Sequence, residues 1–448
     1  MKKSYYIETY GCSLNRSDSE YMESRLREAD FSPADDPLLA DIVILNSCTV
    51  KDRTFLEFQK RITFYEDLCR TREKKGNPLI LIVAGCIPAA SPGEPVIQPY
   101  PLVGPDAIAE IAEVATAALF GKRLKRIRPL HHAPRLYIPH VRRNPVIEIL
   151  PIAGGCLGRC SYCQTRLARG ALVSYPPNQI ERQIRSGLEQ GVREVWLTAQ
   201  DTGAWGLDRG LSLPDLLHQI LKIPGEYRIR LGMANPNHVS RFPDSFFDLF
   251  SDERLFKFMH LPLQSGSDVI LKMMNRLYTS GEYIRICERI YKQYPDFSIS
   301  TDVIVGFPGE EEEDFQQTLD VLNHIKPSVV NRSKFSPRPG TPAAKLPRLH
   351  SRVVSQRSKR LTRLVEHLSL KKNQDFLGKT GVVLIDEKKK KGSVVSRNEY
   401  YKPVIIPLKK TLGGGGSRLE PGNFCTVKIV ESKTFHLIGN PEKPHKKT

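Results

Sequence analysis

The sequence has no long hydrophobic run. Within its 448 residues, no stretch approaches the roughly 18 consecutive apolar residues that a membrane-spanning helix requires. The beginning, MKKSYYIETYGC, has two lysines but no apolar segment like that of a secretion signal, and the end, GNPEKPHKKT, is polar. We therefore expect a cytoplasmic protein without a membrane anchor.

The sequence also shows no tandem repeat and no sign of a disulfide framework. In a reducing compartment, clustered cysteines usually bind metal or take part in catalysis. Nine cysteines are present, and six of them form two sets of three. The remaining three follow no pattern and are interpreted as structural: Cys69, Cys287 and Cys425.

Acidic residues are scarce near the C-terminus. From Thr341 to Thr448 there are 24 lysines and arginines but only 8 aspartates and glutamates, against 67 and 49 in the whole chain. The body of the chain is therefore nearly neutral, and most of the net charge of +18 belongs to its last quarter. A basic module on a neutral body suggests polyanion binding, most commonly of nucleic acid. A solvated lysine-rich surface is the alternative.

The order of apolar and polar segments predicts an α/β fold with several domains. The first third alternates β-rich runs with helical stretches, one of them from about Ser17 to Ala29, which predicts a parallel α/β domain. Six further β-rich runs after Pro145 predict an open or partial (β/α)6 barrel. These are VIEILPIAG, EVWLTAQD, YRIRLGMA, FKFMHLPL, SISTDVIVGF and VVNRSKFS. The amphipathic run from Arg352 to Phe376 is expected to close this domain.

The short strands that follow predict a small antiparallel β-barrel with a flexible loop at Gly413–Gly416. The basic, proline-punctuated segment before the partial barrel is interpreted as a linker. The predicted division is therefore residues 1–125 for the N-terminal α/β domain, 126–144 for the linker, 145–375 for the partial barrel, 376–440 for the small barrel and 441–448 for a basic tail.

One cysteine set lies in a single loop, GGCLGRCSYCQTR, and comprises Cys156, Cys160 and Cys163. The spacing C-x3-C-x2-C allows one loop to hold three corners of a cubane [4Fe–4S] cluster, whose fourth iron then has no protein ligand. The loop follows the first strand of the partial barrel, at the edge where such folds place their chemistry. A zinc site is the alternative, but it requires a fourth ligand.

The other set is spread over the N-terminal domain. Cys12, Cys48 and Cys86 each end a predicted strand, and 36 and 38 residues separate them, about one βαβ crossover each. Parallel strands present their carboxyl ends along one edge, so we expect the three thiols to converge there. Gly11 and Gly85 would allow a bulky cofactor to approach the backbone. Three separate buried core cysteines are the alternative.

With these parts in this order, the chain resembles the methylthiotransferase family of radical S-adenosylmethionine (SAM) enzymes almost from end to end. Segments such as TYGCSLNRSDSEYM, LTAQDTGAWG, RLGMANPNH and TDVIVGFPGE are most similar to its archaeal and eukaryotic branch. The resemblance implies an N-terminal three-cysteine methylthiotransferase domain, a central radical SAM domain and a C-terminal RNA-binding TRAM domain.

The resemblance also implies cofactors and site residues. Cys12, Cys48 and Cys86 would bind an auxiliary [4Fe–4S] cluster, and the catalytic cysteines Cys156, Cys160 and Cys163 a second one that binds SAM. Further contacts to SAM are expected from residues at or near strand ends. They are Tyr162, Gly203, Gln264, Ser265, Asp302 and Gly306. For each of these residues, packing, a turn or a helix cap is the alternative role.

The implied reaction is radical methylthiolation of N6-threonylcarbamoyladenosine at position 37 of tRNA, with the anticodon stem-loop as partner. Isopentenyladenosine in tRNA or an aspartate of a ribosomal protein is the alternative substrate, and a non-catalytic, zinc-containing RNA-binding protein is the alternative class. Tyr400 and Tyr401 would offer stacking surfaces for RNA or belong to the barrel core. We expect a monomer that also needs an electron donor and a sulfur source, neither of which any motif identifies.

Overall fold

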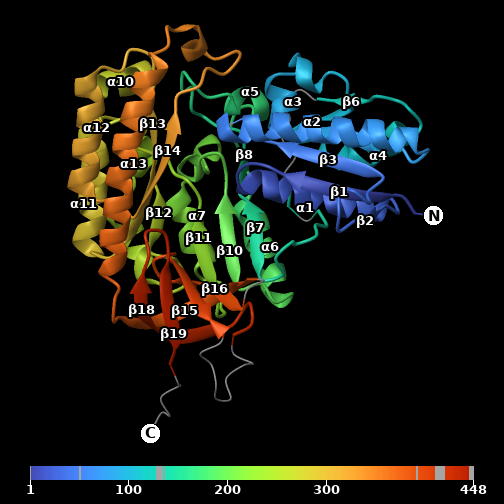
Figure 1. Ribbon diagram of the computed structural model, residues 1–448. Helices are drawn as coiled ribbons and strands as arrows, with labels where there is room; N and C mark the ends of the chain where they lie inside the picture. Colours follow the sequence, from blue (N-terminus) through green and yellow to red (C-terminus); the bar gives the residue numbers. More distant parts are fainter. Residues whose placement is uncertain are drawn as a thin grey trace.

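The computed structural model describes residues 2–49, 52–127, 135–136, 138–389, 392–408 and 419–442. The predicted loop Gly413–Gly416 lies outside the described residues, as do the middle of the predicted linker and most of the predicted tail. Figure 1 shows a parallel α/β unit, a larger β/α unit beside it, and a small barrel below the larger unit. The α/β fold class is confirmed.

The N-terminal unit is a six-stranded parallel sheet in the order β2-β1-β3-β4-β5-β6. Apolar residues of α1 and α4 pack on one face of the sheet, and those of α2 on the other. The elements are β1 (Ser4–Thr9), α1 (Ser13–Glu28), β2 (Ser32–Pro33), β3 (Ile42–Ser47), α2 (Asp52–Lys74), β4 (Ile80–Gly85), α3 (Cys86–Ala90), β5 (Leu102–Val103), α4 (Ile111–Leu119) and β6 (Lys125–Arg126).

The second unit contains the six strands that the sequence predicts for a partial barrel, in two parallel sheets of three. Parallel bridges between Ile229 and Leu255 and between Met233 and His260 join the two sheets. The strands are β7 (Ile147–Pro151), β10 (Glu194–Thr198), β11 (Arg228–Leu231), β12 (Phe258–His260), β13 (Ser298–Val305) and β14 (Val329–Lys334). The longer helices are α6 (Pro177–Glu189), α7 (Leu213–Ile220), α11 (Ser280–Gln293), α12 (Glu312–Ile325) and α13 (Ser351–Gln374).

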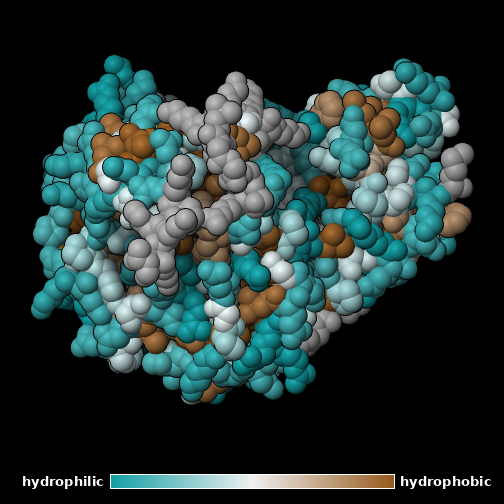
Figure 2. Space-filling model, turned by 90° about the horizontal axis from the view of Figure 1, so that it is seen from below, coloured by the Kyte–Doolittle hydropathy of each residue, from teal (hydrophilic) through white to brown (hydrophobic). Residues whose placement is uncertain are grey.

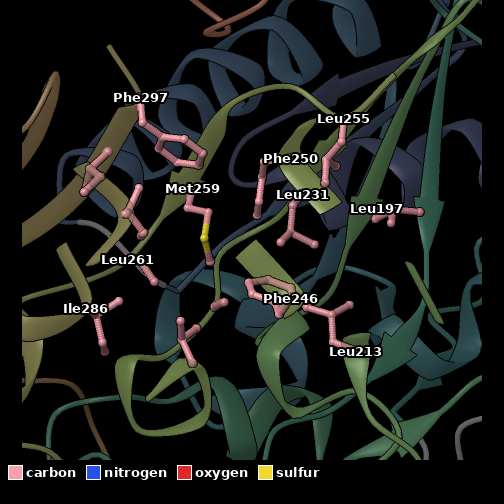
Figure 3. Packing of buried hydrophobic residues seen from close by; sticks show 14 of the residues in the cluster. Leu197, Leu213, Leu231, Phe246, Phe250, Leu255, Met259, Leu261, Ile286 and Phe297 are labelled. Atoms are coloured by element: carbon pink, nitrogen blue, oxygen red, sulfur yellow. The ribbon is translucent and has the colours of Figure 1, made fainter. Parts of the chain in front are cut away.

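Apolar side chains from these strands and helices form the largest core of the protein. Figure 3 shows part of it, where Leu197 of β10, Leu231 of β11 and Met259 of β12 lie among phenylalanines of the surrounding segments. The remaining short helices of this unit are α8 (Pro236–Val239), α9 (Asp244–Asp248) and α10 (Asp268–Met273). This core holds the strands whose carboxyl ends lead to the loop of Cys156, Cys160 and Cys163.

A two-stranded antiparallel sheet, β8 (Ala153–Gly154) and β9 (Val173–Ser174), lies beyond the end of β7. The intervening segment contains the cysteine loop and α5 (Thr165–Arg169). At Gly155, φ is +65° and an added Cβ would lie 1.8 Å from the carbonyl oxygen of Ala171, so the two ends of the segment meet only because this residue is glycine.

The C-terminal unit is a closed five-stranded barrel. Its strands are β15 (Thr380–Lys389), β16 (Ser393–Asn398), β17 (Pro403–Pro407), β18 (Phe424–Ser432) and β19 (Leu437–Pro441). The predicted barrel is confirmed, but β17 and β19 pair in parallel, so it is not wholly antiparallel. Figure 2, which views this end of the molecule, shows a mostly hydrophilic surface with separate hydrophobic groups among the described residues.

The barrel packs against the amino ends of the partial-barrel strands. The guanidinium of Arg228, at the start of β11, lies 4.7 Å from the ring centroid of Phe424 in β18. The ring of Tyr401 lies 4.9 Å from that of Phe256 and 5.0 Å from that of Phe258. Since the cysteine loop follows the carboxyl ends of the strands, the barrel and the loop lie at opposite ends of the second unit.

Three details differ from the expectations or extend them. Helix α1 begins at Ser13, four residues before the predicted start at Ser17. Lys125 and Arg126, at the junction with the predicted linker, form an edge strand that pairs with β5. Among the described residues, no helix combines the length and the apolar character that a membrane crossing requires.

Candidate functional site

The first set of cysteines lies just beyond the carboxyl edge of the N-terminal sheet. Thr9 of β1 is in register with Asn46 of β3, and Ser47 of β3 with Gly85 of β4, so the three strands end at the same level. Cys48 and Cys86 immediately follow β3 and β4, and Cys12 precedes α1. The sheet therefore positions all three residues at one edge.

The structure brings these three cysteines together. The Cys12 thiol lies 3.3 Å from Oδ1 of Asn15, and Nδ2 of Asn15 lies 3.9 Å from Sγ of Cys86. A Cβ on Gly11 would lie 2.5 Å from Cβ of Cys48 and 3.0 Å from its sulfur. Glycine at position 11, with φ of +125°, is therefore required for the loop to pass beside the thiols.

The electrostatic surroundings favour a thiolate in this set. A hydrogen bond with Cys48 lowers the pKa of the Cys12 thiol to about 6, with a further contribution from the positive charge of Arg169. Burial raises the pKa of the Cys86 thiol, and the charge of Arg169 opposes that effect. Because the thiolate is the metal-binding form of cysteine, a nearby cation prepares this set for a metal cluster.

Backbone contacts hold the second set in a tight loop. The amide of Cys156 donates to the carbonyl of Gly170 at 3.1 Å, and that of Cys163 to the carbonyl of Cys160 at 3.2 Å. Ser161 connects the loop to the end of α10, because its hydroxyl donates to the carbonyl of Met273 at 2.8 Å. The loop is therefore attached to other segments at Cys156 and at Ser161, and the bond between Cys163 and Cys160 tightens it.

Each sulfur of this loop already has a hydrogen-bond partner. Sγ of Cys156 accepts from the amide of Gly158 at 3.3 Å, and Sγ of Cys163 from the amide of Thr165 at 3.4 Å. Sγ of Cys160 accepts from Nη1 of Arg276 at 3.2 Å. Donors arranged around sulfur in this way stabilise cluster thiolates and influence the reduction potential.

Burial favours the protonated form of two thiols in this set, Cys156 and Cys163. It raises the pKa of Cys156 to about 12 and also raises that of Cys163. A bound cationic metal centre reverses that preference, because a coordinating thiol is deprotonated outright. The second set is therefore suited to a metal centre rather than to a free nucleophile.

Both sets consist of thiols, which are the ligands that iron–sulfur clusters use. Among the described residues, no three histidine, cysteine, aspartate or glutamate side chains lie close enough together to hold one metal ion. A cubane cluster presents a different iron to each thiolate, so its ligands stand farther apart. Each set supplies three thiols with a glycine nearby, the donors that the predicted [4Fe–4S] cluster would require.

A cavity of about 130 Å³ opens beside the second set. Of the residues expected to contact SAM, Tyr162, Gln264 and Asp302 line this cavity, together with Lys334 and Arg338. The cavity thus combines a carboxylate with two cations.

The backbone of Gln264 is strained, with a φ of +67°. Two hydrogen bonds fix this conformation. The amide of Gln264 donates to the carbonyl of Asp302 at 2.7 Å, and the carbonyl of Gln264 accepts from the amide of Ile304 at 3.0 Å. The carboxylate of Asp302 is hydrogen-bonded to Nε2 of His260 at 2.9 Å. These contacts fix the polar wall of the cavity.

The other expected SAM contacts do not line this cavity. The buried amide of Gly203 donates to Oδ1 of Asp201 at 3.1 Å. Oγ of Ser265 accepts from the amide of Ser267 at 3.2 Å, which helps to shape the loop before α10. Gly306, with φ of +76°, packs against α13, and an added Cβ would lie 2.6 Å from a methyl group of Val354.

Segments next to the two cysteine sets meet at the contact between the first two units. Oγ of Ser13, the residue after Cys12, lies 2.5 Å from Oγ1 of Thr198 at the end of β10. Helix α3, which begins with Cys86, packs against α5, which follows Cys163 (Figure 1). The segments that carry the two sets are therefore in direct contact.

A buried ion pair reinforces this contact. Nη2 of Arg169 in α5 donates to Oδ2 of Asp18 in α1 at 2.6 Å, and both side chains are almost fully buried. Arg135, from the described part of the predicted linker, also pairs with Asp18. The carboxylate of Asp18 in α1 thus connects this helix to α5 and to the described part of the predicted linker.

Sequence reasoning did not identify Asn15, Arg169 or Arg276. Asn15 lies three residues after Cys12 on the first turn of α1, a spacing that would have placed it near the thiol. Arg169 and Arg276 reach the cysteines only through tertiary contacts, for which the sequence carries no local signal.

The two barrel tyrosines take part in packing. Tyr401 lies between the barrel and the second unit, and the ring of Tyr400 lies 5.3 Å from that of Phe376. Of the two expected roles, the structure therefore supports the packing role.

A cysteine loop at the carboxyl end of a partial (β/α)6 barrel is the arrangement of radical SAM proteins, and this chain is one of them, since residues 150–322 match the radical SAM superfamily. Residues 4–101 match the "Uncharacterized protein family UPF0004". The chain belongs to the threonylcarbamoyladenosine tRNA methylthiotransferase family. It is 40% identical over 436 residues to the "Probable threonylcarbamoyladenosine tRNA methylthiotransferase" of Pyrococcus horikoshii, which covers 97% of this chain and 98% of that protein.

A eukaryotic relative agrees with this assignment, and a solved structure is similar in fold. The threonylcarbamoyladenosine tRNA methylthiotransferase of Danio rerio is 36% identical over 445 residues, covering 97% of this chain and 78% of that protein. The radical S-adenosylmethionine methyltransferase TsrM from Kitasatospora setae, solved with cobalamin and a [4Fe-4S] cluster, has a TM-score of 0.55 and 15% identity. The likeness covers 77% of this chain and 74% of TsrM, and it concerns the fold alone.

Proposed function

We propose that this chain converts N6-threonylcarbamoyladenosine at position 37 of tRNA into its 2-methylthio derivative. The observation that carries the proposal is that segments next to the two three-cysteine sets are in contact, α1 with the end of β10 and α3 with α5. A sulfur atom held at one set and a radical generated at the other would then act on one base placed between them.

In this proposal, Cys12, Cys48 and Cys86 hold one [4Fe–4S] cluster, and Cys156, Cys160 and Cys163 hold the other. When bound, the clusters and SAM supply the electron, the radical and the sulfur that this reaction requires. The residues of the chain position these groups and determine the charges and hydrogen bonds around them. Arg276 donates to the sulfur of Cys160, and Asn15 lies between the thiols of Cys12 and Cys86.

SAM is assigned to the cavity lined by Tyr162, Gln264 and Asp302. Its amino acid part carries one positive and one negative charge, and the cavity offers Asp302 for the first and Lys334 and Arg338 for the second. Gly203, Ser265 and Gly306 then act by shaping the neighbouring loops.

The small barrel is assigned to tRNA binding, as the basic composition of the C-terminal quarter suggests. Because the barrel contacts the amino ends of strands whose carboxyl ends lead to the cysteine loop, its RNA contacts lie far from the reacting base. A strand of five residues already spans about 17 Å. The barrel therefore holds the tRNA body by its phosphates, and the anticodon loop reaches the cysteines.

The proposal retains the predicted domain division, with domains at residues 1–125, 145–375 and 376–440. We also propose that the chain is a cytoplasmic monomer and that it receives electrons and sulfur from other components. Light scattering of the purified chain, coupled to gel filtration, tests the monomer, and a stable dimer contradicts it.

Mass spectrometry of tRNA nucleosides tests the function directly. Cells that lack the gene are expected to lose the 2-methylthio form of threonylcarbamoyladenosine and to retain that of isopentenyladenosine. Loss of the second nucleoside instead, or an unchanged profile, contradicts the proposal.

Metal analysis tests the cofactors separately. The anaerobically reconstituted protein is expected to contain about eight irons and eight sulfides per chain. Replacement of Cys48 or Cys160 by alanine is expected to remove about half of the iron, whereas Cys69→Ala serves as a matched control and is expected to retain it. Stoichiometric zinc without sulfide would contradict the assignment.

A further inference from the structure

A hairpin turn of the small barrel presents an aromatic ring to solvent. Ser432 of β18 is paired with Leu437 of β19, so residues 433–436 form the turn between these strands. Within it, Phe435 is 62% exposed, more than any other large apolar side chain in the described part of the barrel. One exposed apolar side chain is common on protein surfaces and needs no explanation by itself. The contacts that hold the turn below this ring distinguish it.

Two buried polar side chains hold the backbone of this turn. Nδ2 of Asn373 donates to the carbonyl of Lys433 at 2.8 Å and to that of Thr434 at 3.2 Å. Oδ1 of Asn373 accepts from Nζ of Lys402 at 2.8 Å, and both side chains are buried. Because an ammonium group only donates, Lys402 keeps the amide oxygen of Asn373 on its own side and the amide nitrogen toward the turn.

This pair of side chains is more than a hairpin turn requires. Burial lowers the pKa of Lys402 to about 8, so a charged lysine at this position is costly. A hairpin can be closed by a few turn residues without a buried lysine. The buried pair holds the backbone beside Phe435 in one conformation, and a ring on a fixed backbone loses less entropy when a flat ligand stacks on it.

Positive charge lies next to this turn. Helix α13, which reaches the barrel beside β18 (Figure 1), has Lys371 and Lys372 in its last turn, directly before Asn373. Lys433 belongs to the hairpin turn itself and pairs with Glu431. Proteins bind unpaired nucleobases with this combination, because an aromatic ring stacks on the base and the lysines attract the phosphates of the nucleic acid.

We propose that Phe435 is a stacking residue for an unpaired base of the tRNA body. The proposal rests on the proposed function, in which the small barrel binds tRNA by its phosphates, and it adds a contact to a base. Because the barrel and the cysteine loop lie at opposite ends of the second unit, this base lies outside the anticodon loop. The rings of Tyr400 and Tyr401, for which the sequence suggested stacking, are engaged in packing.

Binding of tRNA to variants of the full-length protein tests this proposal. The probe is tRNA from cells that lack the gene, which carries threonylcarbamoyladenosine without the methylthio group. Phe435→Ala is expected to weaken binding about tenfold, as loss of a base–aromatic stack commonly does. The dependence of the dissociation constant on salt should not change, because no phosphate contact is lost. Phe435→Trp should keep the affinity of the unsubstituted protein, and the fluorescence of its added indole should be quenched when tRNA binds.

Two control variants separate stacking from other effects. Phe120→Ala removes a ring that is 78% exposed in the N-terminal unit, and its dissociation constant should remain that of the unsubstituted protein. Phe435→Leu keeps an apolar side chain but removes the ring, so it should bind tRNA about as weakly as Phe435→Ala. On an isolated anticodon stem-loop, all variants should have the same affinity, because the stacked base is absent from it.

Unchanged affinity in Phe435→Ala overturns the proposal. Full affinity in Phe435→Leu also overturns it, since an apolar contact without stacking would then be sufficient, and so does equal weakening in Phe120→Ala. A loss of the same size on the isolated stem-loop overturns the assignment to the tRNA body. If the unsubstituted protein does not bind tRNA, the proposed function is contradicted instead.

Discussion

Replacement of Asp18 by asparagine should destabilise the protein far more than an ordinary surface charge change. The Asp18 carboxylate is 1% exposed and pairs with two arginines, Arg135 and Arg169. Arg135 retains a second acidic partner, because its Nη2 lies 3.5 Å from Oδ1 of Asp106. Arg169 is then the buried cation that loses its carboxylate partner.

The size of the effect follows from the geometry. Two unit charges about 4 Å apart at an effective dielectric constant of about 20 interact by about 4 kcal/mol. Removal of one partner of a buried pair typically costs about 3–5 kcal/mol. We therefore expect Asp18→Asn to lower the free energy of unfolding by about 4 kcal/mol, and the double variant Asp18→Asn/Arg169→Met to regain part of that loss, because no unpaired cation stays buried.

Urea unfolding of cluster-free protein, followed by tryptophan fluorescence, measures this loss. The chain has two tryptophans, Trp196 in β10 and the fully buried Trp205 shortly after it, so the signal reports on the unit that contains α5. Glu181→Gln is the control, because Glu181 and Arg185 form a partly exposed pair that is expected to contribute under about 1 kcal/mol. An Asp18→Asn variant no less stable than the control would refute the buried-pair argument.

Two further substitutions test local features. Gly306→Ala should lower the free energy of unfolding by about 3 kcal/mol, because the new Cβ meets Val354 at 2.6 Å. Gly378→Ala, at a similar φ but with open space around it, should lower it by only about 1–2 kcal/mol. Equal losses in urea unfolding would contradict the packing argument. Burial raises the pKa of Glu20 to about 7 from its ordinary value of 4.5. This raised pKa contributes stability that is complete below about pH 4.5 and is lost as the pH rises through about 7, a change of about 3 kcal/mol. The difference in unfolding free energy between the unsubstituted protein and Glu20→Gln should follow that course, and a pH-independent difference would contradict it.

Much of the fold was predictable because the signals are local. Runs of apolar residues bounded by turns predicted the six strands of the partial barrel, and each appears where expected. The start of α1 was predicted too late, because Ser13 and Leu14 belong to the cysteine loop in sequence but already adopt helical conformation. The parallel pairing of β17 with β19 joins strands distant in sequence, and nothing in their residues signals its direction.

The residues of the candidate site also differ in whether a local sequence signal predicts them. The cysteines were identifiable because the spacing in one loop and the positions at strand ends are visible in the sequence. The polar residues around them were not, because Arg169 and Arg276 approach sulfur from segments that only the tertiary fold brings near. Gly306 packs closely on α13, and its expected contact to SAM stays a prediction.

Polar groups contribute to the contact between the two cysteine-bearing units, and we expect this to matter for function. Apolar packing tolerates small shifts of one unit against the other, whereas a buried carboxylate shared by two arginines is strongly penalised when either partner moves away. The hydrogen bond between Ser13 and Thr198 and the ion pair between Asp18 and Arg169 lie within a few residues of Cys12 and Cys163. The proposed reaction uses both sets on one base and so depends on the distance between them, which these contacts help to maintain.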